Sequence, residues 1–118
     1  MTVKEIVKIL DCRVLTGERN LDSEVKAGCG CDLMSDVLAF IKPGAILLTG
    51  LNNPQAIRTA EMSDVGVVCF VRGKQPSEEL IALARENEIT LLTTSLPMFD
   101  ACGKLYTNGL VGWSEYKE

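Results

Sequence analysis

The stretch Ile46-Leu-Leu-Thr-Gly-Leu-Asn-Asn-Pro-Gln-Ala-Ile-Arg58 decides the fold of this chain. The apolar run from Ala45 to Leu48 has the length and composition of a strand that is buried on both faces. The run ends at Thr49-Gly50, and Asn53-Pro54 then begins a helix, because asparagine is a favoured N-cap and proline suits the first helical position. A strand followed directly by a helix N-terminus leaves free backbone N–H groups at the carboxyl edge of a sheet. We expect any small ligand to bind at that edge.

Length, charge and hydropathy restrict the class of protein. With 118 residues the chain is long enough for one domain with a core and too short for two. Twelve basic residues are scattered among sixteen acidic ones, for a net charge of −4, so nucleic-acid binding is not expected. No apolar stretch approaches the roughly 18 residues that a membrane span needs, and the N-terminus reads as an amphipathic helix rather than a signal peptide. We therefore expect a cytoplasmic protein with no membrane partner.

The rest of the chain alternates between strand and helix patterns. Strands are predicted at residues 13–15, 24–28, 45–48, 65–71 and 90–93, and helices at 3–11, 33–41, 54–63, 78–87 and 95–105. Short links between alternating strands and helices are typical of βαβ units. The predicted fold class is α/β, a single domain over residues 1–110 with a mainly parallel four- or five-stranded sheet flanked by helices. Residues 111–118, with the only tryptophan, Trp113, are predicted to be a tail or an arm that packs on a partner.

Polar residues at the expected helix starts predict their caps. Thr2 and Glu5 fit a capping box, and Asp32 and Ser77 are expected to cap the helices that follow them. Three methionines, Met34, Met62 and Met98, stand at helical positions expected to face the core.

Several short motifs resemble one known family. They are Leu15-Thr-Gly17, Lys42-Pro-Gly44 before the central strand, Gln75-Pro-Ser77, and Leu92-Thr-Thr-Ser95 with Phe99 in the last helix. Over roughly residues 1–110 the chain resembles a DRTGG domain, a small α/β module that occurs alone or inside larger enzymes. That family is in turn similar to the N-terminal domain of HPr kinase/phosphorylase. The resemblance implies a regulatory or interaction role, often as a dimer, without catalysis.

The motif that names the family is degenerate in this chain. The usual Gly-Asp-Arg-Thr after the central strand is replaced by Gly50-Leu-Asn-Asn53, and the usual Thr-Gly-Gly after the next strand by Val71-Arg72-Gly73. An activity tied to the aspartate and arginine of that motif therefore does not carry over.

The carboxyl ends of the predicted parallel strands would gather a set of polar residues and glycines. They are Thr49, Gly50, Asn52, Asn53, Arg72, Gly73, Thr93 and Thr94. Open α/β sheets bind ligands in the crevice outside those ends, and this inventory suits a phosphate or carboxylate better than a proton-transfer reaction. The alternative is that these are ordinary solvated loop and cap residues.

Cysteine and histidine content argues against most cofactors and catalytic groups. The pair Cys29 and Cys31 is a weak candidate for a metal or redox site, since a closed zinc site needs four ligands; Cys69 is expected to lie in the core. No histidine is present, which excludes Ser-His and Cys-His pairs. Gly73-Lys74 is followed by Gln75, so no P-loop is present. We predict no cofactor and no enzymatic activity.

These observations support two hypotheses for the function. The first is a non-catalytic regulatory or protein-interaction module that acts as a homodimer. The second is a sensor that binds a phosphorylated metabolite or nucleotide at the carboxyl edge of the sheet.

Overall fold

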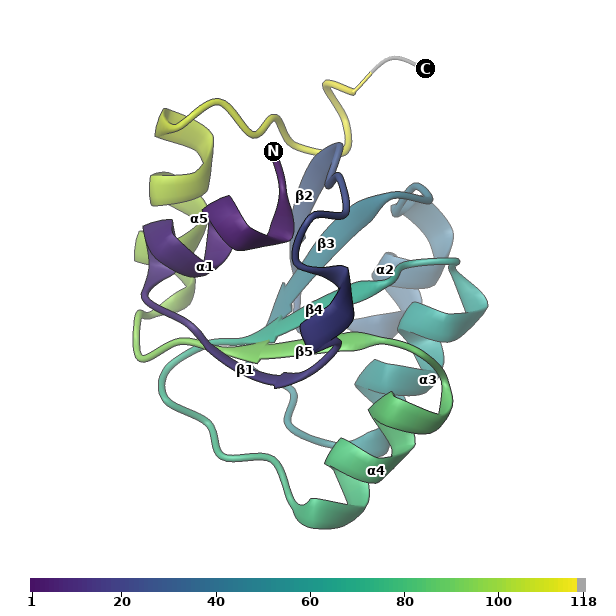
Figure 1. Ribbon diagram of the computed structural model, residues 1–118. Coiled ribbons are helices and arrows are strands. Elements are labelled where there is room, and N and C mark those ends of the chain that lie inside the picture. Colours follow the sequence, from purple (N-terminus) through teal and green to yellow (C-terminus); the bar gives the residue numbers. More distant parts are fainter. Residues whose placement is uncertain (117–118) are drawn as a thin grey trace.

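A computed structural model describes residues 1–116 and shows helices packed on both faces of one sheet (Figure 1). The elements in chain order are α1 (Val3–Leu10), β1 (Arg13–Thr16), the 3₁₀ helix η1 (Glu18–Asn20), β2 (Ala27–Gly30), α2 (Met34–Phe40), β3 (Ala45–Thr49), α3 (Pro54–Met62), β4 (Val67–Phe70), α4 (Glu78–Glu86), β5 (Thr90–Thr93) and α5 (Met98–Thr107). None of the helices in the described part of the chain is long and apolar enough to cross a membrane.

The sheet has five strands in the order β1-β5-β4-β3-β2. Strands β2, β3, β4 and β5 are parallel, and β1 joins the far side of β5 antiparallel. The predicted α/β class with a mainly parallel sheet is confirmed. The order of the strands was not predicted, because side-chain periodicity identifies elements without indicating which of them are neighbours.

The alternation of side chains along β3 divides the core into two layers. Ile46 and Leu48 pack with α1 and α5 on one face of the sheet, whereas Leu47 packs with α2, α3 and α4 on the other. In Figure 1 the α1–α5 pair and the α2–α3–α4 group lie on opposite sides of the strands. All residues of β3, β4 and β5 are buried, so the sheet needs both helical layers.

Most of the predicted helix caps are confirmed. Thr2 and Glu5 form a capping box at α1, Asn53 accepts a hydrogen bond from the backbone N–H of Gln55, and Ser77 accepts one from Leu80. Asp32 is a correction: α2 begins after Leu33, which makes no side-chain cap, and the carboxylate of Asp32 binds elsewhere.

Other boundaries and one burial assignment also differ from the prediction. Strand β2 lies at Ala27–Gly30 rather than 24–28, so Cys29 and Gly30 belong to the sheet. Helix α5 begins at Met98 instead of residue 95, and β4 is confined to Val67–Phe70. Met62 does not face the core: its side chain is 63% exposed, because it stands at the last position of α3.

The segment after α5 returns to the open side of β2. The carbonyl of Val111 accepts a hydrogen bond from the N–H of Gly28, and the N–H of Trp113 donates to the carbonyl of Gly28. The Trp113 ring stacks on Phe40 of α2, with centroids 5.7 Å apart and planes 18° from parallel. Residues 111–113 thus extend the sheet edge by one short pairing. The last two residues of the predicted tail, 117–118, lie outside the described residues.

Gly17 offers a direct test of the packing between β1 and β5. Its φ is +82°, and a Cβ atom there would meet the Oγ1 and backbone of Thr90. Gly17→Ala should therefore lower the free energy of unfolding by about 2–4 kcal/mol in urea denaturation. Gly103→Ala is the control: in α5, with nothing within 4 Å of its Cβ position, it should raise stability by roughly 0.5–1 kcal/mol. Equal stability of the two variants would contradict this description.

Candidate functional site

The ends of β3, β4 and β5 lie side by side at the carboxyl edge of the sheet. Thr49 pairs with Phe70 and Phe70 with Thr93, so the segments that follow these three strands are neighbours. The structure therefore brings the predicted binding residues together at one edge. What differs from the prediction is how many of their polar atoms are already bonded within the protein.

Asp32 occupies the place where an anion was expected. Its Oδ1 accepts a hydrogen bond of 2.9 Å from the Thr49 hydroxyl and one of 2.7 Å from the backbone N–H of Gly50. The Thr49 hydroxyl in turn accepts the N–H of Leu51 at 3.1 Å. An external phosphate or carboxylate would have to compete with this internal carboxylate for the same donors.

The turn after β4 uses its backbone amides internally. Arg72 and Gly73 both have positive φ, +62° and +66°; the N–H of Arg72 donates to the carbonyl of Leu96 and that of Gly73 to the carbonyl of Thr94. The guanidinium of Arg72 lies over Gly50, where a Cβ atom would be 2.5 Å from its Nη2. Among residues 1–116 this exposed guanidinium makes no ion pair.

The two threonines at the end of β5 are interior residues. Thr93 is 4% exposed and Thr94 is 2% exposed. The Thr94 hydroxyl donates to the carbonyl of Leu10 at 2.6 Å and accepts the N–H of Leu96, so it joins α1 to the sheet. Both of these hydrogen bonds are internal to the protein.

The side chains of Asn52 and Asn53 differ in which of their atoms lack a hydrogen-bond partner. Asn53 caps α3 through its Oδ1. Asn52 donates from Nδ2 to the carbonyl of Gln75, but its Oδ1 is buried without a hydrogen-bond partner. Of the predicted binding residues, Arg72 therefore offers the one exposed charged group, and the Asn52 Oδ1 is a buried, unpaired acceptor at the same edge. These two groups could position a ligand, and they are not a catalytic set.

The Cys29–Cys31 pair does not form a metal centre in the described part of the chain. No group of three His, Cys, Asp or Glu side chains within residues 1–116 is placed to hold a metal ion. Burial, with smaller effects of Cys31 and Cys102, raises the pKa of the Cys29 thiol to about 11. A thiol that is protonated at neutral pH is a poor ligand and a poor nucleophile. Cys69 is fully buried, as predicted.

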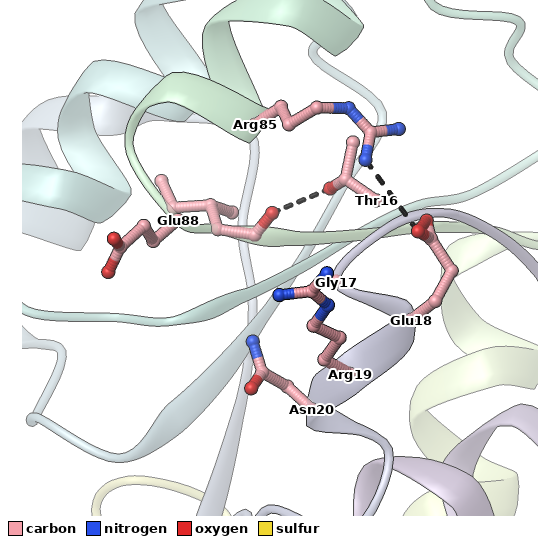
Figure 2. A pocket seen from close by; sticks show the side chains of 8 residues that line it. Thr16, Gly17, Glu18, Arg19, Asn20, Arg85 and Glu88 are labelled. Carbon is pink, nitrogen blue, oxygen red and sulfur yellow. Dashed lines mark hydrogen bonds and ion pairs between the residues drawn. The ribbon is translucent and has the colours of Figure 1, made fainter.

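A groove that was not predicted opens at the opposite, amino edge of the sheet. Its volume is about 480 Å³, and it lies between the turn at residues 16–20 and the end of α4. Arg85 and Glu18 face each other across this groove (Figure 2), and their side chains form an ion pair of 3.6 Å. The Thr16 hydroxyl donates a hydrogen bond of 2.6 Å to the carbonyl of Ile89. Arg19 and Glu88 add one charge of each sign to the lining. The charges are balanced, and Leu15-Thr-Gly17 was the sequence signal that pointed to this turn.

The sequence profile of the DRTGG domain matches residues 5–106, and the chain belongs to the DRTGG domain family. A similar solved structure is that of the CBS and DRTGG domains of the regulatory region of Clostridium perfringens pyrophosphatase, complexed with the activator diadenosine tetraphosphate. The TM-score is 0.72 at 20% sequence identity, over 99% of this chain and 50% of that one. The chain thus spans half of that solved regulatory region and shares its fold there. No curated protein matches the chain in sequence.

We expect the hydrogen bonds of the Asp32 carboxylate to contribute measurably to the stability of the protein. Asp32→Ala leaves the Gly50 N–H and the buried Thr49 hydroxyl without their acceptor, so we expect a loss of about 1–3 kcal/mol in the free energy of unfolding. Asp22→Ala, at an exposed loop carboxylate, is the matched control and should change stability by less than about 0.5 kcal/mol. If both variants unfold at the same urea concentration as the wild type, the hydrogen bonds of Asp32 do not stabilise the carboxyl edge of the sheet.

Proposed function

We propose that this chain is a non-catalytic regulatory module of the cytoplasm that acts by forming a homodimer through the open edge of β2. The observation that carries the proposal is the concentration of exposed apolar side chains on both sides of that edge. The unpaired cysteines of the structure agree with a reducing compartment.

One side of the edge is bordered by α2. Phe40 is 54% exposed and stacks on Trp113, whose backbone pairs with Gly28 of β2. Leu33, seven residues before Phe40, is 58% exposed. Leu33 stands immediately before α2 and three residues after the end of β2, so it lies in the short link that joins this edge strand to the helix.

The other side is bordered by α5. Tyr106, which is 56% exposed, lines a small groove with Gly28 and Gly30. Phe99 lies seven residues earlier on the same face and is 86% exposed. We call the four side chains Leu33, Phe40, Phe99 and Tyr106 the β2 rim. Exposed apolar side chains gathered around one element mark an interaction surface more often than scattered ones do.

The backbone of β2 adds directional donors and acceptors to the rim. Gly28 exchanges two hydrogen bonds with residues 111–113, but no hydrogen bond from that segment reaches Gly30 within the described residues. An edge strand with free backbone groups is a template for a further strand. A second copy of the chain offers the same edge and the same four side chains, so a two-fold contact pairs apolar surface with apolar surface. The Tyr106 hydroxyl donates to the Glu115 carboxylate, so its ring is the apolar part of this residue in the rim.

The dimer can be tested by light scattering coupled to gel filtration. Leu33→Glu and Phe99→Glu introduce charges on the two sides of the rim and should each weaken the dimer at least about tenfold. Met62→Glu is the control, because Met62 is 63% exposed at the end of α3 and lies outside the rim. A wild type that is monomeric at every concentration, or rim variants as dimeric as the control, would refute the proposal.

A sensor of a phosphorylated metabolite or nucleotide at the carboxyl edge is the second candidate function. It is favoured by the exposed guanidinium of Arg72 beside Gly50 and by the unpartnered Oδ1 of Asn52. The pyrophosphatase region of the same fold was solved with a nucleotide activator, which makes diadenosine tetraphosphate a reasonable probe.

This candidate predicts a specific loss of affinity. Arg72→Gln removes one charge-assisted hydrogen bond and should weaken binding of diadenosine tetraphosphate by roughly 1.5–3 kcal/mol in calorimetry. Arg58→Gln, at an exposed arginine of α3, should leave the affinity unchanged. No heat of binding with the wild type, or equal losses in both variants, would exclude this edge as the site.

A further inference from the structure

Two cysteines that are 57 residues apart in sequence meet inside the α1–α5 layer. The sulfur of Cys12, in the link between α1 and β1, lies 3.9 Å from the sulfur of Cys69 in β4. A disulfide bond has an S–S length of about 2.05 Å, so the two sulfurs would need to approach by roughly 2 Å. Cys12 lies outside the regular elements and is only half-buried, so its side chain has room to make that movement.

The two thiols differ in their access to solvent. Cys69 is fully buried, whereas Cys12 is half-buried. The hydrogen bond with Cys12, followed by burial, raises the pKa of the Cys69 thiol well above its ordinary value. A small oxidant therefore reaches Cys12 first, and Cys69 is held protonated behind it.

We propose that Cys12 and Cys69 form a reversible disulfide when the protein meets a peroxide. In the first step the Cys12 sulfur attacks hydrogen peroxide, the O–O bond breaks, and a sulfenic acid and one water form. In the second step the Cys69 thiol, a slow nucleophile while it is protonated but held 3.9 Å from its target, attacks the Cys12 sulfur. The S–O bond breaks, and the departing hydroxide takes the Cys69 thiol proton and leaves as a second water. Two thiols lose two electrons and two protons, and the peroxide is reduced. A dithiol reductant reverses the cross-link by exchange.

The other thiols are placed for different contacts. Cys31 donates to the carbonyl of Leu33 at 3.4 Å, and Cys102 donates to the thioether sulfur of Met98 at 3.7 Å. Cys29 and Cys31 are two positions apart on extended backbone, which separates their Cα atoms by roughly 6.6 Å, near the upper limit for a disulfide. Within residues 1–116 the Cys12–Cys69 contact is the one hydrogen-bonded thiol pair. The disulfide would link the segment after α1 covalently to β4, a central strand of the sheet. This proposal does not depend on the proposed dimer.

Peptide mapping after mild oxidation tests this inference. The full chain is treated with hydrogen peroxide, unfolded, alkylated with N-ethylmaleimide and digested with trypsin. We expect the number of alkylated thiols to fall from the five free cysteines of the structure to three. Peptide 9–13 should be joined to peptide 59–72, and dithiothreitol should restore all five thiols.

Matched variants make the result specific. Cys12→Ser should abolish the cross-link, and Cys69→Ala provides the same test at the buried position, with circular dichroism to confirm that it folds. Cys31→Ser should retain the cross-link. Five alkylated thiols after oxidation, Cys12 over-oxidised without a cross-linked peptide, or a cross-link that involves Cys29, Cys31 or Cys102 would each overturn the proposal.

Discussion

Burial of β3, β4 and β5 on both faces is the constraint on which the rest of the structure depends. Because no side chain of these strands can face water, the chain must supply one helical layer for each face, and α1 with α5 and α2 with α3 and α4 supply them. The polar groups of the sheet are therefore found at the two ends of these strands and along the outer strands β1 and β2. At the carboxyl end the protein satisfies most of them itself, through Asp32 and the Thr94 hydroxyl. The edge of β2 remains the surface where unsatisfied apolar and backbone groups meet.

Much of the fold could be predicted from local sequence, because its central elements have strong local signals. The apolar run of β3 and the Asn53-Pro54 start of α3 depend only on neighbours in the chain. The position of β2 was missed because Ala27–Gly30 is glycine-rich and has little intrinsic strand preference; pairing with β3 holds it in place. The antiparallel β1 and the strand order arise from long-range packing, which periodicity does not describe.

The sequence was enough to predict where the candidate site lies. It was not enough to predict which of the polar groups there are free to bind a ligand. Strand ends that share a parallel sheet must share an edge, so the gathering of Thr49, Arg72 and Thr94 follows from element order. Whether a hydroxyl is free depends on partners far along the chain: Thr49 binds a residue 17 positions away and Thr94 one 84 positions away. The same is true of Cys12 and Cys69, which have no sequence signal as a pair. Trp113, a predicted tail residue, is placed by its stack on Phe40.

Native mass spectrometry of the gently purified protein, over a range of concentrations, tests the central claim that this domain works by self-association. We expect a dimer whose mass equals twice that of the chain, together with a monomer whose fraction grows on dilution. A monomer at all concentrations would contradict the account, and a monomer that carries the added mass of a nucleotide would replace it with the sensor at the carboxyl edge.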